Sequence, residues 1–346
     1  MTWCKKTGKF ICLTCGENNR LRDGEFWIWR SYYTIGCPFC HEPHLALDRL
    51  EYQTKHPWQL HSELLHQRSH LSVEQTYKGA VATTFLPGER VISDEVVGKA
   101  WDKAASKWWG RYDEFGDPNR RYIIDPAIRQ ILGTVKSKHI LDAGCGNGYL
   151  SRLLARQGAR MVGVDTSEEA IRMAKTAESN EPQDIEYHVA SLCDLSAFGN
   201  NTFDVIVSNI VLNDLQDLDK AIAELHRVLK PGGKLVFSIM HPCFPSPPVH
   251  GWVRTPLDSD RAEDWHYWKV DQYYEQNIET WQLGDLPRLY YFHRPFSLYM
   301  KKLIENGFVL TDFEEPVPSR EDIDQHYRQL NDGARIAWFL VIGIVK

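Results

Sequence analysis

The sequence predicts an α/β protein with a doubly wound, mostly parallel sheet, and two observations support this expectation. A short apolar run at residues 140–141 leads to Asp142, then to glycines at alternate positions and to a helical pattern that begins at Tyr149. A second apolar run ends at Asp165, about twenty residues after the glycine-rich loop. Strand, glycine-rich loop, helix and second strand in this order form a βαβ unit, whose ligand lies at the carboxyl ends of the strands.

The spacing of the glycines indicates which ligand the loop binds. Glycine suits such a loop because it accepts positive φ values and lets a ligand lie directly against the backbone. Gly144, Gly146 and Gly148 read G-x-G-x-G. A dinucleotide fingerprint reads G-x-G-x-x-G and would need a glycine in place of Tyr149. Asp165 is placed to accept both hydroxyl groups of a ribose, which fits NAD and S-adenosylmethionine equally. The glycine spacing therefore decides, and it favours S-adenosylmethionine.

The rest of the chain supplies further strands and helices. Apolar runs predict strands at residues 185–190, 203–209, 234–240, 308–314 and 336–345. Helical spacing of apolar residues predicts helices at residues 97–112, 125–132, 149–156, 170–175, 218–229 and 296–306. Thr166 and Glu169 form a capping box that is expected to begin the helix at residue 170. Together with the first two strands, these elements predict a seven-stranded sheet.

Four motifs resemble those of a known family. Residues 141–148, 163–165, 203–209 and 227–233 resemble the successive motifs of class I S-adenosylmethionine-dependent methyltransferases, in the small-molecule branch that includes the ubiquinone-biosynthesis type. The resemblance covers residues 96–346 and implies that the last two strands form an antiparallel sheet edge. It also implies that a helix ahead of the fold closes over the cofactor. The family usually has an acid at the position of Ser191 to hold the adenine amino group, so this chain departs from the pattern there.

The motifs and the resemblance together give a set of candidate cofactor-binding residues. Most of them belong to the glycine-rich loop or follow a predicted strand, and two tryptophans lie on the helix ahead of the fold. The candidates are Asp142, Gly144, Gly146, Asn147, Asp165, Thr166, Ser191, Leu192, Asn209, Trp101 and Trp109. Tyr112 is a further candidate on that helix. Ordinary core packing is the alternative interpretation of these aromatic side chains.

Methyl transfer is an in-line displacement at a sulfonium methyl group, so an enzyme must chiefly align the acceptor and exclude water. A general base is needed only if the acceptor atom carries a proton that the product loses. His241, which directly follows a predicted strand, is the first candidate for such a base. Asp214, Asn213 and His293 are the second choices, and a purely structural role is the alternative for His241.

Four of the eight cysteines form two C-x-x-C pairs, Cys12 with Cys15 and Cys37 with Cys40. Four thiolates at this spacing are typical of a tetrahedral structural zinc site, which leaves no open position for catalysis. Residues 1–50 therefore resemble a zinc ribbon, with Cys4, His41 and His44 as substitute ligands. The alternative is a small domain with reduced thiols that packs on the main body.

Two segments have a composition of their own. Residues 51–96 are polar and irregular and are interpreted as a linker between the zinc-ribbon-like module and a methyltransferase domain at 97–346. A second metal site built from the linker's four histidines is a weaker alternative. Residues 241–295 contain 11 aromatic residues in 55 positions, 20% against 12% for the whole chain. This insertion is expected to wall the substrate site, with an oligomer interface or plain packing as alternatives.

Composition limits the partners. The 40 basic and 46 acidic residues give a net charge of −6, which does not support broad binding to a phosphate backbone. No apolar run approaches about eighteen residues and the start is no signal peptide, so a soluble, cytoplasmic protein is expected. The leading hypothesis is a methyltransferase for a small-molecule O or N acceptor, with a protein partner for the zinc ribbon as an option. The alternatives are an rRNA or tRNA methyltransferase whose zinc ribbon docks RNA and, less favoured, a non-catalytic cofactor-binding scaffold.

Overall fold

The computed structural model divides the chain into two compact units, residues 1–75 and residues 76–346. It describes residues 2–4, 9–11, 18–19, 34–36, 43–45, 81–85, 92–110, 113–246, 249–255, 261–283 and 286–346. In the first unit, β1 (Thr2–Cys4), β2 (Lys9–Ile11) and β3 (Asn18–Asn19) form an antiparallel sheet. β4 (Thr34–Gly36) pairs with β5 (Pro43–Leu45). The predicted zinc ligands Cys12, Cys15, Cys37 and Cys40 lie outside the described residues.

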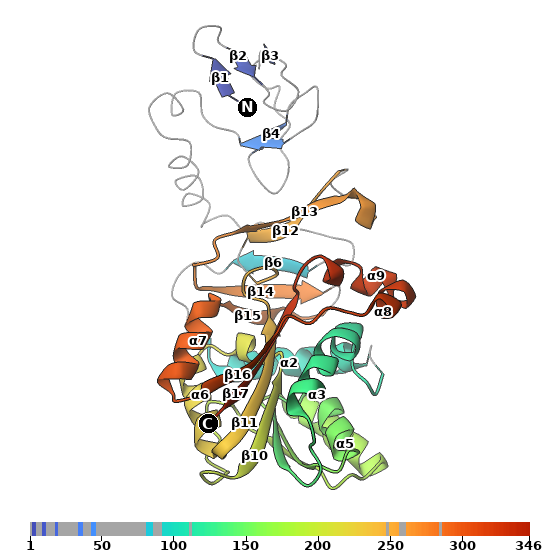
Figure 1. Cartoon of the computed structure of the whole chain (residues 1–346), viewed down its shortest axis with the longest axis vertical. Helices are drawn as coiled ribbons and strands as arrows, with labels where there is room; N and C mark the ends of the chain where they lie inside the picture. Colours follow the sequence, from blue (N-terminus) through green and yellow to red (C-terminus); the bar gives the residue numbers. More distant parts are fainter. Residues whose placement is uncertain are drawn as a thin grey trace. The chain divides into compact units, whose positions relative to one another are not determined.

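The second unit is built on a seven-stranded sheet with the order β16-β17-β11-β10-β7-β8-β9 (Figure 1). Its strands are β7 (His139–Ala143), β8 (Arg160–Asp165), β9 (Glu186–Val189), β10 (Phe203–Asn209), β11 (Leu229–Met240), β16 (Val309–Glu314) and β17 (Phe339–Val345). The five strands from β7 to β11 are parallel, whereas β17 runs antiparallel to both β11 and β16. The predicted mostly parallel sheet with an antiparallel edge is therefore confirmed.

Helices cover both faces of this sheet, as a doubly wound fold requires. The main helices are α2 (Asp94–Trp109), α3 (Asp125–Leu132), α4 (Tyr149–Ala155), α5 (Glu168–Asn180), α6 (Leu218–Val228) and α7 (Phe296–Glu305). Ile128, Leu150 and Ile171 of α3, α4 and α5 belong to one buried core, and Leu225 and Tyr299 of α6 and α7 belong to the other. Among the described residues, no helix is long and apolar enough to cross a membrane.

Shorter helices fill the connections between these elements. They are η2 (Arg120–Ile124), η3 (Leu212–Asp214), η4 (Ala262–Asp264), α8 (Arg320–Gln325), α9 (Tyr327–Leu330) and η5 (Asp332–Ala334). Of these, η3 has the most direct bearing on a site, because it follows β10 at the carboxyl edge of the sheet.

Several predicted element ends are wrong by a few residues. α5 begins after Ser167, whose hydroxyl oxygen accepts the Ala170 amide at 3.0 Å, so Thr166 is not the cap. The Ser167 hydroxyl also donates to Asp102 of α2. The contact with α2 therefore favours Ser167 over Thr166 as the residue that caps α5. α2 itself begins at residue 94 instead of 97, because Ser93 caps it. β11 begins at residue 229 instead of 234, and β17 at 339 instead of 336.

The aromatic insertion forms regular antiparallel structure. β12 (Val249–Arg254) pairs with β13 (Trp265–Asp271). β14 (Asn277–Leu283) is the central strand of a second sheet, between β15 (Leu289–His293) and β6 (Val81–Phe85). β6 comes from the segment interpreted as a linker, so residues 81–85 belong to the second unit. Figure 1 shows this three-stranded sheet beyond the carboxyl ends of β10 and β11.

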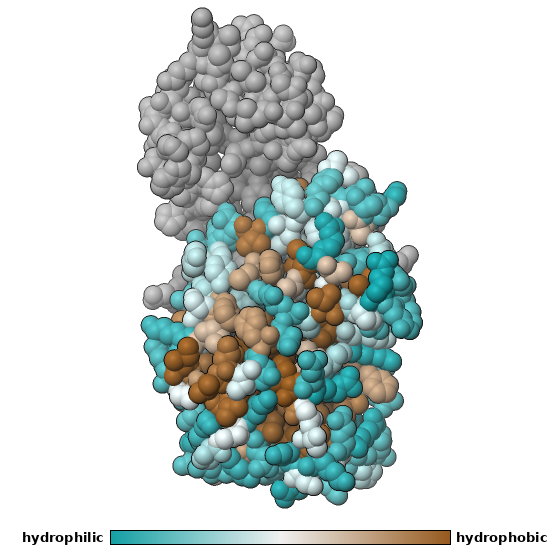
Figure 2. All heavy atoms as spheres, in the orientation of Figure 1, coloured by the Kyte–Doolittle hydropathy of each residue, from teal (hydrophilic) through white to brown (hydrophobic). Residues whose placement is uncertain are grey.

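One edge of the main sheet is apolar on its surface. Val309, Leu310 and Phe313 of the edge strand β16 are 63%, 45% and 42% exposed, and Ile304 of α7 is 65% exposed. Figure 2 shows apolar side chains gathered over α7 and β16. This patch lies at the antiparallel edge, away from the carboxyl ends of β7 and β8.

Candidate active site

The glycine-rich loop between β7 and α4 has the backbone that its sequence predicts. Gly144, Gly146 and Gly148 have φ values of 83°, 54° and 74°, in the region that favours glycine. A Cβ atom on Gly146 would lie 2.6 Å from Cζ2 of Trp109, so the indole ring lies directly against this loop. The loop is therefore covered by α2, the helix that carries Trp109.

Asp165 lies at the carboxyl end of β8 and reaches the glycine-rich loop. One carboxylate oxygen accepts the Gly146 amide at 2.9 Å and the other accepts the Ser167 amide at 2.9 Å. Burial raises the pKa of this carboxyl above its usual range, while the backbone donors oppose the rise. These two amides fix the orientation of the carboxyl group. A carboxylate oxygen has a second lone pair, so both oxygens can still accept a hydroxyl donor.

α2 is hydrogen-bonded to residues that follow the carboxyl ends of β8 and β9. Asp102 accepts hydrogen bonds from the Ser167 hydroxyl at 2.7 Å and from the Glu169 amide at 3.1 Å. At the other end of the helix, the Ser191 hydroxyl donates to the carboxylate of Asp94. Sequence analysis missed Asp94, although the Ser-Asp-Glu run at residues 93–95 is a typical helix start. The structure thus places the carboxylate of Asp94 beside Ser191, the position at which the resembled family usually has an acid.

A buried polar network lies behind the loop. Asp125 accepts hydrogen bonds from the Tyr149 hydroxyl and the Asn209 side-chain amide, both at 3.1 Å. Ser238 in turn donates to the Asn209 side-chain oxygen at 2.7 Å. Burial raises the pKa of Asp125 to about 7, with the Tyr149 hydrogen bond opposing the rise. Asn209, a candidate cofactor residue, is therefore engaged in holding the loop, α3 and β11 together.

Asp142 and Asn147 also stabilise the loop. Asp142 accepts the Ser151 hydroxyl at 2.6 Å, and burial raises the pKa of its carboxyl to about 7. The Asn147 side chain accepts the Tyr149 amide at 3.2 Å, and its carbonyl oxygen accepts Arg152 at 2.7 Å. Both residues therefore hold the start of α4 in place behind the candidate cofactor site.

The three candidate bases have different surroundings. His241 is 5% exposed; its Nδ1 accepts the Cys243 amide at 3.1 Å, so its Nε2 carries the proton donated to Glu315 at 2.8 Å. Burial lowers the pKa of His241. Because both ring nitrogens have partners, His241 can act as a base only after one of these bonds breaks. Glu315 follows the edge strand β16, so this histidine is directed toward the sheet edge.

His293 is also fully engaged. Its Nε2 donates to the carbonyl oxygen of Tyr273 and its Nδ1 accepts the Ser246 hydroxyl, both at 2.8 Å. Burial lowers its pKa to about 4, so the ring stays neutral at neutral pH.

Asp214 has different surroundings from the two histidines. It lies in η3 at the carboxyl edge of the sheet, is 9% exposed, and accepts the Asn213 side-chain amide at 2.7 Å. Burial raises its pKa to about 8.

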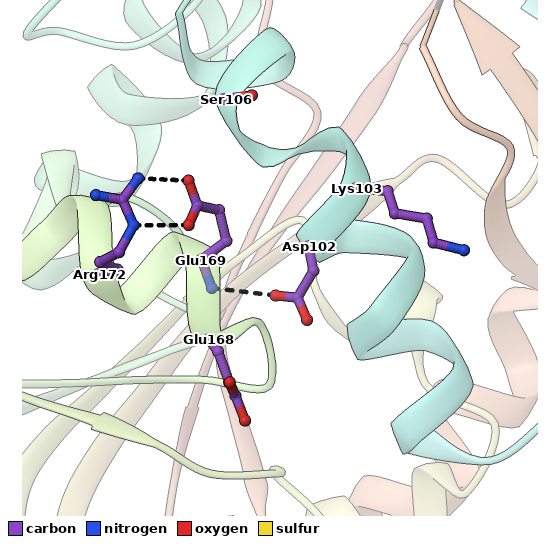
Figure 3. A pocket seen from close by; sticks show the side chains of 6 residues that line it. All are labelled: Asp102, Lys103, Ser106, Glu168, Glu169 and Arg172. Carbon is purple, nitrogen blue, oxygen red and sulfur yellow. Dashed lines mark hydrogen bonds and ion pairs between the residues drawn. The ribbon is translucent and has the colours of Figure 1, made fainter.

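Two pockets flank α2. Figure 3 shows an open pocket between α2 and α5, lined by Asp102, Lys103, Ser106, Glu168, Glu169 and Arg172. Glu169 pairs with Arg172 in this pocket, and the Glu169 backbone amide donates to Asp102. No residue of the glycine-rich loop lines it. A smaller pocket adjoins the loop and is lined by Trp108, Trp109, Asp113, Gly116, Asp117, Arg120, Asn147 and Tyr149.

Comparison with known proteins agrees with this geometry. Residues 141–237 match the family described as a methyltransferase domain. A solved S-adenosylmethionine-dependent methyltransferase from Mesorhizobium loti is 26% identical, with a TM-score of 0.55 over 68% of this chain and all of that one. A protein described as a putative enzyme of the same kind, from Listeria monocytogenes, is 25% identical, with a TM-score of 0.53 over 63% of this chain and 94% of that one. Residues 141–237 thus resemble a methyltransferase domain, and the chain shares the fold of these two solved proteins.

Curated relatives match just under half of this chain. A ubiquinone biosynthesis O-methyltransferase of Alkalilimnicola ehrlichii is 31% identical over 156 residues, which are 44% of this chain and 62% of the relative. The protein of the same name from Coxiella burnetii strain Dugway is 34% identical over 159 residues, which are 45% of this chain and 65% of the relative. The match thus spans less than two thirds of the length of either relative.

Proposed function

We propose that the protein transfers the methyl group of S-adenosylmethionine to an oxygen or nitrogen atom of a small molecule. The observation that carries this proposal is the position of Asp165 against the glycine-rich loop, under a helix that closes the site. The methyltransferase-domain match and the relatives named ubiquinone biosynthesis O-methyltransferase support it. Its direct test is the transfer of a labelled methyl group from the cofactor to molecules of low mass.

The cofactor would lie along the carboxyl ends of β7, β8 and β9. Asp165 would accept the two ribose hydroxyls, and the backbone of the loop at Gly144 and Gly146 would line the methionine part. Trp109 and Trp101 of α2 would close over it. When bound, the cofactor supplies an activated methyl group, and the protein's share is to align the acceptor with that methyl and to exclude water.

Asp214 is our preferred base on the acceptor side. Its carboxyl lies at the carboxyl edge, after β10, and its pKa of about 8 is close to neutral pH. His241 and His293 remain predictions for this role, and each has both ring nitrogens bonded in the structure. An acceptor that loses a proton during transfer would give it to Asp214, and one that carries no such proton would need no base.

We propose that the adenine amino group is held by Asp94 together with Ser191. If so, Asp94→Asn should weaken binding of S-adenosylhomocysteine about tenfold, because a hydrogen bond to a charged group is worth about 1.5 kcal/mol or more. It should also reduce the preference for this ligand over the analogue that carries an oxo group in place of the amino group. Calorimetry with both ligands measures these effects.

Two variants sharpen this test. Adding Ser191→Asp to Asp94→Asn returns an acid to the loop after β9 and should restore most of the affinity and the preference. Glu95→Gln is the matched control, since Glu95 is exposed and pairs with Lys99 on the same helix turn. Equal binding by wild type and Asp94→Asn would refute the assignment of Asp94.

We also propose a structural zinc ion held by Cys12, Cys15, Cys37 and Cys40, on the strength of their spacing. In the described part of the chain, no group of three or more His, Cys, Asp or Glu side chains is arranged to hold a metal. Elemental analysis of the full-length protein should therefore find about one zinc per chain. Cys15→Ser with Cys40→Ser should lose it, whereas Cys145→Ser, a buried cysteine of the second unit, should keep it. A zinc-free wild type would contradict the proposal.

An RNA acceptor is the alternative, with the zinc ribbon as the docking module. The net charge of −6 weighs against it, since RNA binding draws on clustered cations. In addition, residues 208–211 lack the Asn-Pro-Pro-aromatic motif that acts on base amino groups. A small acceptor is therefore the function that the chain supports best.

A further inference from the structure

The three-stranded sheet β15-β14-β6 carries a buried acid with an unpartnered oxygen atom among the described residues. Glu279 of β14 is 3% exposed, and its Oε1 has no hydrogen-bond partner among the described residues. Burial alone raises the pKa of this carboxyl to about 8. A buried carboxyl group without a partner costs stability, so its presence calls for a ligand that satisfies it.

A second unsatisfied oxygen lies in η3. Asn213 is 1% exposed and donates its side-chain amide to Asp214 at 2.7 Å. Its own side-chain oxygen, Oδ1, is buried without a partner in the described part of the chain. The side-chain oxygen of Asn213 is therefore a buried acceptor that lacks a donor.

Tyr291 connects the two places. It is opposite Glu279 in the β14–β15 register, so both side chains point to the same face of the sheet. Burial raises the pKa of the Tyr291 hydroxyl well above its usual value, and the nearby Glu279 and Asp214 carboxyl groups add to this rise. Leu289, two residues before Tyr291 and on the same face, packs against Ala100 and Ala104 of α2. This face of the small sheet is therefore directed toward α2 and η3, where the acceptor of the proposed reaction must lie.

Among the described residues, no cation is bonded to the Glu279 Oε1 atom or to the Asn213 Oδ1 atom. Arg294, which follows β15, donates to the carbonyl oxygens of Leu215 and Gln216 at 2.5 and 2.7 Å. Arg120 is paired with Asp117. A negatively charged methyl acceptor would be repelled by the carboxyl groups of Glu279 and Asp214. A neutral hydroxyl group on the methyl acceptor would donate to one of the oxygens without balancing a charge. A protonated amine carries three donors and a positive charge, so it suits this set of oxygens.

We propose that Glu279 and the side-chain oxygen of Asn213 form an acceptor subsite that binds a positively charged amino group of the methyl acceptor. The proposal rests on the proposed function, because it assigns the substrate class of the same site. Asp214 stays available as the proton acceptor, and Glu279 pairs with the cation. The aromatic insertion at residues 241–295 would then select the substrate through Glu279 on β14 as well as through its aromatic residues.

Three probe molecules of the same shape test this inference: benzylamine, benzyl alcohol and benzoate, titrated by ligand-observed NMR. The full-length protein is first saturated with S-adenosylhomocysteine. Benzylamine should bind at least about tenfold more tightly than benzyl alcohol, and benzoate should bind more weakly than both. Glu279→Gln should remove the preference for the amine, whereas Glu263→Gln, an exposed acid of η4 that pairs with Arg261, should keep it.

A stability measurement separates binding from folding. Glu279→Met removes an unsatisfied buried carboxyl group, so it should leave the melting temperature unchanged or higher while the preference for the amine is lost. A lower melting temperature for both Glu279 variants would show a structural role instead. The inference is overturned if the cofactor-loaded protein binds no benzylamine, prefers benzoate, or keeps its preference in Glu279→Gln. Failure to bind S-adenosylhomocysteine at all would instead contradict the proposed function.

Discussion

Asp165→Ala should lower the affinity for S-adenosylhomocysteine by about 100-fold. Two hydrogen bonds from ribose hydroxyls to a carboxylate would be lost, worth about 3 kcal/mol together. The same replacement frees the Gly146 and Ser167 amides, which the carboxylate now holds at 2.9 Å. Calorimetry on wild type and variant measures the change.

Asp194→Ala is the matched control for this experiment. Asp194 follows β9 at the same edge of the sheet, is exposed, and accepts only the neighbouring Ser196 amide among the hydrogen bonds of its side chain that the structure describes. Its removal should leave cofactor affinity unchanged. If Asp165→Ala binds as tightly as Asp194→Ala while remaining folded by circular dichroism, Asp165 does not hold the ribose.

Gly146→Ala should nearly abolish cofactor binding and also destabilise the second unit. Alanine at a φ of 54° costs about 1 kcal/mol, and its Cβ would lie 2.6 Å from the Trp109 ring. Relief of that clash requires α2 to move off the loop, at a cost of about 1–3 kcal/mol for overpacking. Thermal melts and calorimetry report the two consequences separately.

Gly232→Ala provides the comparison, because Gly232 has a φ of 73° but nothing within 4 Å of the added Cβ. It should cost only the backbone strain and leave cofactor affinity intact. Trp109→Ala in the Gly146→Ala background should recover the stability lost to the clash while the strain remains. Cofactor binding by Gly146→Ala equal to that of Gly232→Ala would contradict the closed position of α2 over the loop.

The features that sequence analysis predicted correctly are local in the chain. The glycine-rich loop, the position of Asp165 at the end of a strand and the alternation of strands and helices depend on residues within one βαβ unit, so spacing alone reveals them. The antiparallel edge of the sheet followed from the family resemblance. The start of α5 was misplaced, because Ser167 is selected by Asp102, a residue from a different element.

The features that sequence analysis missed depend on contacts between distant segments. Asp94 meets Ser191 across 97 positions of the chain, and β6 joins β14 from a segment that is polar and irregular. Glu279 has no neighbouring motif, and its burial follows only from the pairing of β14 with β15. His241 is an ordinary strand-end histidine in the sequence, and only the structure brings Glu315 to its ring.

The most direct test of the account is the fate of a labelled methyl group. The full-length protein, with S-adenosylmethionine labelled in the methyl carbon, is incubated with a cell extract that has been separated into a low-mass fraction and an RNA fraction. Mass spectrometry should detect the label in an oxygen- or nitrogen-methylated small molecule, formed by wild type and not by Asp165→Ala. Label found in the RNA fraction alone, or in neither fraction despite tight binding of the cofactor, would contradict the proposed function.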